Sequence, residues 1–151
     1  MRNIKYIVVH CTATPQNTTI ESIQRFWKEV RQWHAPGYHY VIKPDGEIIQ
    51  LLDENMISNG AFGHNPVCVH IAYIGGVDKD TKPLDNRTDS QKNSLFNKLI
   101  ELSEKYPQAQ ILGHRDFPGV AKACPSFDVK SWLASYVPDL SDSKHITGIA
   151  A

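Results

Sequence analysis

The chain has 151 residues, the length of one domain that buries about 70% of its unfolded surface, so no second domain is needed. Its 16 basic and 16 acidic residues cancel, which argues against nucleic acid or an anionic membrane as a partner recruited by overall charge. Its three cysteines are odd in number and scattered, which argues against a disulfide framework and favours synthesis in a reducing compartment.

The N-terminal segment is predicted to enter a strand by Ile4, and the apolar run Ile7-Val8-Val9 ends in His10. We therefore expect no signal peptide and synthesis in the cytoplasm. No apolar run approaches the ~20 residues of a membrane span, so no stable membrane insertion is expected. Successive strand side chains point to opposite faces, so His10 and Cys11 can hardly bind one metal ion. We expect Cys11 and Cys68 to pack in the core.

A helix and a hairpin follow. Thr18-Thr19-Ile20-Glu21 has the pattern of a capping box, and the helix is predicted to lie on the sheet and to run to about Trp33. Its apolar residues at helical spacing are Ile20, Ile23, Phe26, Trp27 and Val30. Pro36-Gly37 stops the helix. Strands over 38–43 and 47–52 then flank the turn signal Pro44-Asp45-Gly46, which predicts a β-hairpin.

The second half predicts a strand from Val67 to Gly75, a helix capped by Thr88-Asp89-Ser90-Gln91, a strand over 110–113 and a short helix over 129–136. The inner stripe of the long helix is Leu95, Leu99, Leu102 and Tyr106, and Pro107 ends it. This order predicts a single α/β domain over residues 1–138, with helices flanking a central mixed β-sheet. Residues 139–151 have too little apolar content to pack firmly and are expected to form a flexible tail.

Three side chains have the chemistry of an open zinc site at one end of this sheet. His10 and His114 each end a short apolar run, which is typical of buried strands that present a side chain at the sheet edge, and Cys124 follows in the next loop. Two imidazoles and one thiolate leave the fourth zinc position to water, as in catalytic sites. Taken singly, each residue has an alternative role as a packed core group.

Five segments carry a more specific pattern: Val9–Thr14, Gly37–Gly46, Tyr73–Gly76, Leu112–Asp116 and Lys122–Asp128. In this order they resemble the type-2 N-acetylmuramoyl-L-alanine amidases, a zinc amidase family that includes small bacteriophage endolysins and the peptidoglycan-recognition proteins. The resemblance covers residues from about 4 to 133. It implies one Zn²⁺ per chain, bound by His10, His114 and Cys124, and it implies Tyr38 and Lys122 as the catalytic residues.

The charge of such a site suggests roles for the two catalytic residues. Two neutral imidazoles and one thiolate leave zinc a formal charge of +1, enough to activate water toward an amide carbonyl. Lys122 would stabilise the resulting oxyanion, although the residues alone favour a solvated loop lysine. Tyr38 would donate a proton, and Tyr40 is an equal candidate by alternation along one strand; the resemblance selects Tyr38. His39 would face the other way and be structural.

Other residues near these segments have two interpretations each. Ser126 and Asp128 would either hydrogen-bond around the metal ligands or cap the last helix. The family commonly has His-Ala where this chain has Gly60-Ala61, so substrate contacts from this loop are uncertain from sequence. His64 and Asn65 are candidates for such contacts, with His64 replacing the missing imidazole, but an exposed loop histidine commonly has no such role.

The resemblance implies hydrolysis of the amide between the lactyl group of N-acetylmuramic acid and L-alanine in peptidoglycan. Two other functions remain open. The first is a non-catalytic peptidoglycan-binding module, although such relatives usually lack the cysteine ligand and Cys124 is present. The second is a cysteine hydrolase that uses Cys124 with a histidine. Without a signal peptide, the enzyme would reach the wall through a separate pore-forming protein, as a phage or prophage endolysin does, or as a toxin exported by a dedicated machine.

Overall fold

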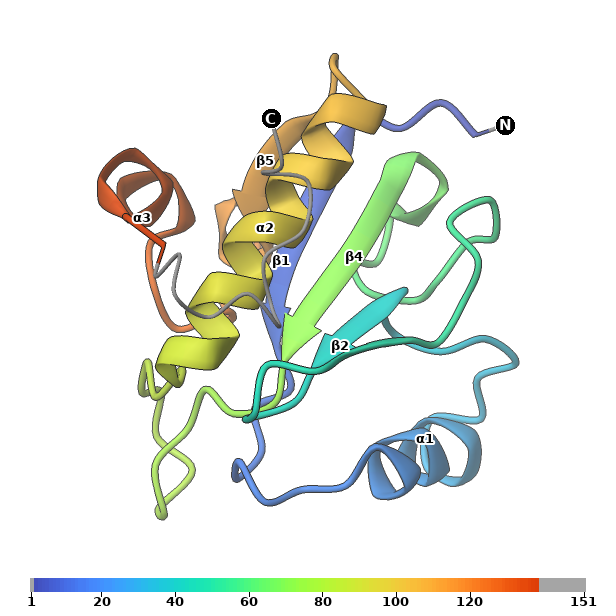
Figure 1. Cartoon of the computed structure of the whole chain (residues 1–151). Helices are drawn as coiled ribbons and strands as arrows, with labels where there is room; N and C mark the ends of the chain where they lie inside the picture. Colours follow the sequence, from blue (N-terminus) through green and yellow to red (C-terminus); the bar gives the residue numbers. More distant parts are fainter. Residues whose placement is uncertain (1, 139–151) are drawn as a thin grey trace.

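Residues 2–138 are described by a computed structural model of the chain (Figure 1). Their elements, in chain order, are β1 (Tyr6–Cys11), α1 (Ile20–Glu29), β2 (Tyr40–Ile42), β3 (Ile48–Gln50), the short 3-10 helix η1 (Asn65–Val67), β4 (Cys68–Tyr73), α2 (Asp89–Lys105), β5 (Gln110–Gly113), the 3-10 helix η2 (His114–Asp116) and α3 (Val129–Ser135). The tail expected over 139–151 lies outside the described residues.

The strands form one five-stranded sheet in the order β3-β2-β4-β1-β5. β1 is parallel to β4 and β5, β2 is parallel to β4, and only β3 is antiparallel to its neighbour. This arrangement confirms the predicted α/β fold with a central mixed sheet. The register pairs Val9 with Gly113, so His10 and His114 follow at the same end of two adjacent strands.

The two faces of the sheet are covered differently. Alternate β1 residues Ile7, Val9 and Cys11 belong to the main core beneath α2 and α3, whereas Val8 lies in a second cluster on the opposite face. In Figure 1, α2 and α3 lie together against one side of the sheet, and α1 lies apart from them near β2. Cys11 and Cys68 are both buried in these clusters, as predicted from the alternation of strand side chains.

The first helix differs from its prediction in three ways. Its N-cap is Thr19, whose side chain accepts a hydrogen bond from the Ser22 backbone N–H, so the proposed Thr18–Glu21 capping box is wrong by one residue. The helix ends at Glu29 and not near Trp33. Its buried stripe is narrow: Ile23 and Trp27 are buried, while Phe26 and Val30 are 45% and 65% exposed. A helix at the margin of the sheet buries only the side chains that point directly at it.

The predicted cap of the long helix and the predicted hairpin turn are both confirmed. Thr88 and Gln91 form the predicted capping box of α2, and α2 gives way at Tyr106 just before Pro107. The Pro44-Asp45-Gly46 turn joins β2 and β3 as an antiparallel hairpin, with Gly46 at a φ of 90° that glycine adopts without strain. The strands β2, β3 and β4 are shorter than predicted, although backbone hydrogen bonds such as His39 N–H to the His70 carbonyl continue the pairing beyond their ends.

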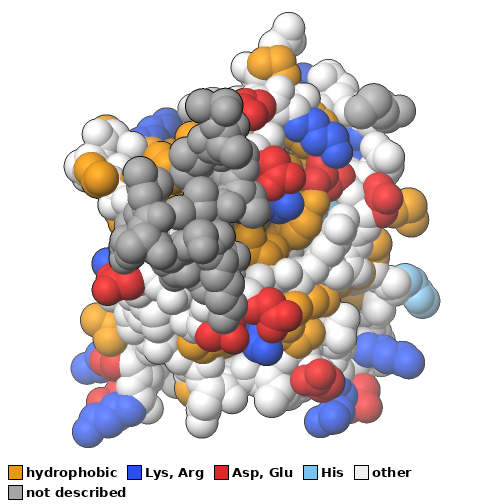
Figure 2. All heavy atoms as spheres, in the orientation of Figure 1, with side chains coloured by type: hydrophobic (Ala, Val, Ile, Leu, Met, Phe, Trp, Pro, Cys, Tyr) orange, Lys and Arg blue, Asp and Glu red, His pale blue; other side chains and the backbone are white. Residues whose placement is uncertain are grey.

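The surface carries charges of both signs. Acidic and basic side chains lie among one another on the face drawn in Figure 2. Within residues 2–138, none of the helices combines the length and apolarity needed to cross a membrane.

A buried carboxylate fastens the loop after β3 to the main core, and we expect it to make stability sensitive to acid. Glu54 accepts hydrogen bonds from the hydroxyls of Tyr40 and Tyr106 and pairs with the Lys105 ammonium, which lies 3.0 Å away. Burial opposes ionisation, but the hydrogen bonds hold the pKa of Glu54 below its ordinary value of 4.5. Its contribution is therefore present above about pH 4.5 and is lost as the pH falls below it.

Replacing the Glu54 carboxylate should lower stability at neutral pH and should matter less in acid. Glu54→Gln is expected to lower the free energy of unfolding at pH 7 by about 1–3 kcal/mol. The difference between wild type and variant should shrink as the pH falls from about 5 to 3, because the wild-type carboxylate is then protonated. Urea unfolding at several pH values measures both quantities. A pH-independent difference would contradict the assignment.

Candidate metal centre

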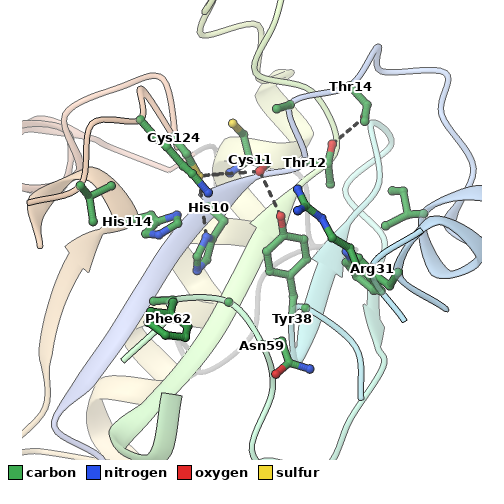
Figure 3. A pocket seen from close by; sticks show the side chains of 18 of the residues that line it. His10, Cys11, Thr12, Thr14, Arg31, Tyr38, Asn59, Phe62, His114 and Cys124 are labelled. Atoms are coloured by element: carbon green, nitrogen blue, oxygen red, sulfur yellow. Dashed lines mark hydrogen bonds between the residues drawn. The ribbon is translucent and has the colours of Figure 1, made fainter. Parts of the chain in front are cut away.

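The three predicted ligands converge at one end of the sheet (Figure 3). His10 is the penultimate residue of β1, His114 begins η2 directly after β5, and Cys124 lies on the loop before α3. Each offers a nitrogen or sulfur atom, and these atoms lie within 4.8 Å of one another. The His10 Nδ1 atom is 3.7 Å from the Cys124 Sγ atom, and the His10 and His114 ring centroids are 4.8 Å apart.

Backbone contacts hold the Cys124 loop against the strand ends. The Arg115 N–H donates to the Cys124 carbonyl at 2.9 Å, which ties the loop to the residue after His114. The Cys11 N–H donates to the Cys124 Sγ atom at 3.3 Å. The Tyr73 hydroxyl donates to the Pro125 carbonyl at 2.7 Å. These bonds come from three different segments, so the sulfur position is set by the tertiary structure and not by its loop alone.

The geometry and charge of this group fit zinc. Tetrahedral zinc with bonds of about 2.0 Å to nitrogen and 2.3 Å to sulfur places these ligand atoms about 3.5 Å apart, close to the observed His10–Cys124 separation. Burial, with the neighbouring His70, holds the pKa of His10 well below its usual range. Burial and the nearby Lys122 lower the pKa of His114 to about 4. Both imidazoles are therefore neutral at pH 7 and have a lone pair for a metal.

The same electrostatics disfavour Cys124 as a free nucleophile. The neighbouring Cys11 thiol and burial raise the pKa of Cys124 well above its ordinary value. Cysteine hydrolases need the opposite shift, because the thiolate is the attacking species. A bound metal cation favours the thiolate directly, so the site suits Cys124 as a ligand better than as a nucleophile.

Tyr38 and Tyr40 are not equivalent in the structure, contrary to the expectation from strand alternation. β2 begins only at Tyr40, so the alternation does not reach Tyr38. The Tyr38 ring lies 5.0 Å from the His10 ring and its hydroxyl donates to the Cys11 carbonyl at 3.3 Å. Tyr40 is buried on the other side with Glu54. Burial raises the pKa of Tyr38 well above its ordinary value, so it stays a proton donor.

The group opens into a pocket of about 950 Å³. Lys122 is exposed and lines this pocket beside the ligands, where its charge acts on both His10 and His114. Figure 3 shows Tyr38 standing between the His10–Cys124 group and the Arg31 side chain, with Phe62 on the opposite rim. Further lining residues come from α1 and from the loops that follow β1, β3 and η2, among them Thr12, Thr14, Phe26, Trp27, Asn59 and Val120.

The two loop candidates lie in different surroundings. His64 lines the pocket, but its ring stacks on Phe117 with centroids 4.1 Å apart, which turns it into part of the wall. The Asn65 Oδ1 atom accepts from the Ala61 N–H at 2.8 Å and from the His70 ring at 2.9 Å, so Asn65 braces the loop from within. At position 60 this chain has glycine where the family commonly has histidine. The imidazole nearest to that position is that of His70 and not that of His64.

Ser126 and Asp128 lie beyond the pocket lining. The Ser126 hydroxyl donates to the Gly76 carbonyl at 2.8 Å and joins the Cys124 loop to the segment after β4. Asp128 is the N-cap of α3, where its carboxylate accepts from the Ser131 N–H at 3.1 Å. Of the two interpretations that the sequence left open, the contacts of Asp128 match the helix cap.

The sequence prediction missed His70. It is fully buried in β4, and its Nδ1 atom lies 2.8 Å from the His10 Nε2 atom. One local signal was available: a histidine inside the apolar strand Cys68-Val69-His70-Ile71-Ala72-Tyr73 needs buried hydrogen-bond partners. Its partners were not readable, because they depend on which strand lies beside β4. His39 is buried next to it, as the structural role predicted for it requires.

Comparison with known proteins identifies the family of the chain. Residues 1–127 match the family described as N-acetylmuramoyl-L-alanine amidase. The endolysin of Enterobacteria phage K11 is 35% identical over 131 residues, which cover 83% of this chain and 82% of that protein.

Two solved structures are similar in fold. The Ph2119 endolysin from a Thermus scotoductus MAT2119 bacteriophage has a TM-score of 0.75 and 28% identity, over 89% of this chain and 84% of that one. Apis mellifera PGRP-SA has a TM-score of 0.71 over 91% and 86% of the two chains, and its 21% identity limits that likeness to the fold. The family match and the coverage of the phage relative together make this chain an amidase that belongs to the N-acetylmuramoyl-L-alanine amidase family.

Proposed function

We propose that residues 1–138 form the catalytic domain of a zinc-dependent amidase that hydrolyses the bond between the lactyl group of N-acetylmuramic acid and L-alanine in peptidoglycan. The observation that carries the proposal is the His10, His114 and Cys124 group at the floor of an open pocket, with Tyr38 and Lys122 beside it. Three protein ligands leave one position for water, which is the arrangement of catalytic zinc sites and not of structural ones.

The residues of the pocket divide the reaction among them. Zinc, when bound, acts as a Lewis acid that makes water nucleophilic at neutral pH. Water oxygen bonds to the lactyl carbonyl carbon and the carbon–nitrogen bond to L-alanine breaks. Lys122 supplies positive charge for the carbonyl oxygen as it becomes negative. Tyr38, whose raised pKa keeps it protonated at neutral pH, gives a proton to the departing nitrogen and regains one from the added water.

The binding-module alternative is less well supported by the site. A module that only binds peptidoglycan needs neither a metal-ligand set nor a half-buried tyrosine hydroxyl next to it, and this pocket contains both. The matched family and the phage relative favour an enzyme as well. The cysteine-hydrolase alternative has less support, because burial disfavours a free Cys124 thiolate and the sulfur lies beside two imidazoles as a metal ligand would.

The biological role that fits is that of an endolysin. We propose that the chain accumulates in the cytoplasm of the producing cell and reaches the wall once a separate pore-forming protein opens the membrane. The K11 phage endolysin, which this chain matches over 82% of that protein's length, supports this role. Expression with and without a co-expressed pore former tests it: lysis is expected only with the pore, and rapid lysis without it would contradict the proposal.

The cleaved bond is identified by the new ends it creates. Purified protein is expected to release new L-alanine amino termini from purified peptidoglycan and no new reducing sugar ends, because only the amide is cut. Cys124→Ser, assayed in parallel, controls for contaminating hydrolases. New reducing ends would mean glycan cleavage and would overturn the assignment, while wall binding without any release would favour the binding module.

A further inference from the structure

A chain of hydrogen bonds runs from the zinc-ligand candidate His10 into the interior. The His10 Nε2 atom lies 2.8 Å from the His70 Nδ1 atom, and the His70 Nε2 atom lies 2.9 Å from the Asn65 Oδ1 atom. His10 and His70 come from adjacent parallel strands and are 1% and 0% exposed. No other described residue is recorded as a hydrogen-bond partner of the His10 Nε2 atom, so His70 alone determines what that atom does.

The proton positions along this chain follow from its inner end. The Ala61 backbone N–H donates to the Asn65 Oδ1 atom at 2.8 Å, which identifies that atom as the amide oxygen and an acceptor. The His70 Nε2 atom must therefore carry a proton and donate to it. In a neutral imidazole the other nitrogen is an acceptor, so the His70 Nδ1 atom accepts a hydrogen bond from the His10 Nε2–H group. The His10 Nδ1 atom is left with its lone pair, facing the Cys124 sulfur at 3.7 Å.

The His70 ring is itself held in place. Its backbone N–H donates to the His39 Nδ1 atom at 3.0 Å, and the two rings are stacked with centroids 6.0 Å apart at an interplanar angle of 12°. The remaining side of the ring lies against the backbone of Gly60. A Cβ atom at Gly60 would lie only 2.5 Å from the His70 Cγ and Nδ1 atoms. The ring can occupy this place only because position 60 carries no side chain.

We propose that His70 is a positioning residue that fixes the tautomer and ring orientation of the zinc ligand His10, and that Gly60 is needed to make room for it. This accounts for the departure from the His-Ala pair common in the family. In this chain the imidazole comes from His70 of β4, and the loop has glycine at position 60. The inference rests on the zinc site proposed above. It adds one polar group behind the ligand, of the kind that commonly fixes metal-binding histidines.

Two near-isosteric variants separate hydrogen bonding from packing. In His70→Asn the amide oxygen takes the place of the Nδ1 atom and still accepts from His10, whereas in His70→Leu a methyl group stands there. Zinc affinity, measured by competition with a chromophoric chelator, should fall about 10- to 100-fold in His70→Leu. The loss should be smaller in His70→Asn, and the visible spectrum of the cobalt-substituted protein should change mainly in His70→Leu. Ile71→Ala, on the opposite face of β4, should lower the melting temperature without changing zinc affinity.

A second test uses the contact with Gly60, and its first variant leaves His70 unchanged. Gly60→Ala should weaken zinc binding in the wild-type background, because the new methyl group displaces the His70 ring, and should have little further effect in the His70→Gly background. Equal zinc affinity and cobalt spectra in wild type, His70→Leu and Gly60→Ala would overturn the inference. Absence of zinc binding by the wild type would instead overturn the proposed zinc site itself.

Discussion

Cys124→Ser and His114→Ala should each lose tight zinc binding and, with it, all measurable amide hydrolysis. The proposed site has three protein ligands among residues 2–138, and removing one leaves two, too few to hold the ion against solvent. Chelation of the wild-type protein should have the same effect and added zinc should reverse it. Metal content by atomic emission and the release of L-alanine amino termini measure the two losses on the same samples.

The same experiment distinguishes the metalloenzyme from a cysteine hydrolase. Iodoacetamide should react slowly with the zinc-loaded protein, because a metal-bound thiolate is shielded, and faster after chelation. Cys68→Ser is the matched control, since Cys68 is buried in the cluster under η1 and lies away from the metal-ligand group. Full activity of the metal-free protein, destroyed by iodoacetamide, would make Cys124 the nucleophile and remove zinc from the mechanism.

Tyr38→Phe and Lys122→Ala should keep the metal and lose turnover. Neither residue belongs to the ligand group, yet both line the pocket next to it. Loss of one proton donor or one oxyanion contact lowers kcat by about 10²-fold or more. Zinc stoichiometry should stay at one per chain in both variants, and the loss should fall on kcat more than on KM.

Two control substitutions test whether these effects are local. Tyr40→Phe removes a hydroxyl that donates to Glu54 in the core, so it should reduce stability and leave kcat unchanged. Lys130→Ala removes an exposed ammonium on α3, away from the pocket, and should change neither. If Tyr38→Phe kept wild-type turnover, proton transfer would have to be assigned to water, and the role of Tyr38 would be reduced to packing against His10.

The sequence by itself determined the elements whose signals are local. Thr88 and Gln91 cap α2 through contacts three residues apart, and the Pro44-Asp45-Gly46 turn sets its own hairpin. The three residues that the structure brings together as a metal-ligand group could be named in advance as well. His10 and His114 end apolar strands, and parallel strands that end together bring their terminal side chains to one edge of the sheet.

Only the tertiary structure decided the contacts that depend on where a neighbouring segment lies. β2 begins at Tyr40, where its pairing with Ile71 of β4 starts, and Tyr38 lies before the strand and contacts His10 while Tyr40 enters the opposite side. Alternation within the chain cannot give the first paired residue of a strand, since pairing is a property of two segments.

The same reason explains the length of α1 and the role of His70. Phe26 and Val30 have helical spacing, but only Ile23 and Trp27 of this stripe are buried against the sheet. A histidine in an apolar strand signals a buried polar contact without naming its partner, and a glycine in a loop does not say what fills its space. β1 had to lie beside β4, with the loop folded over both, before His10, His70 and Gly60 came into contact.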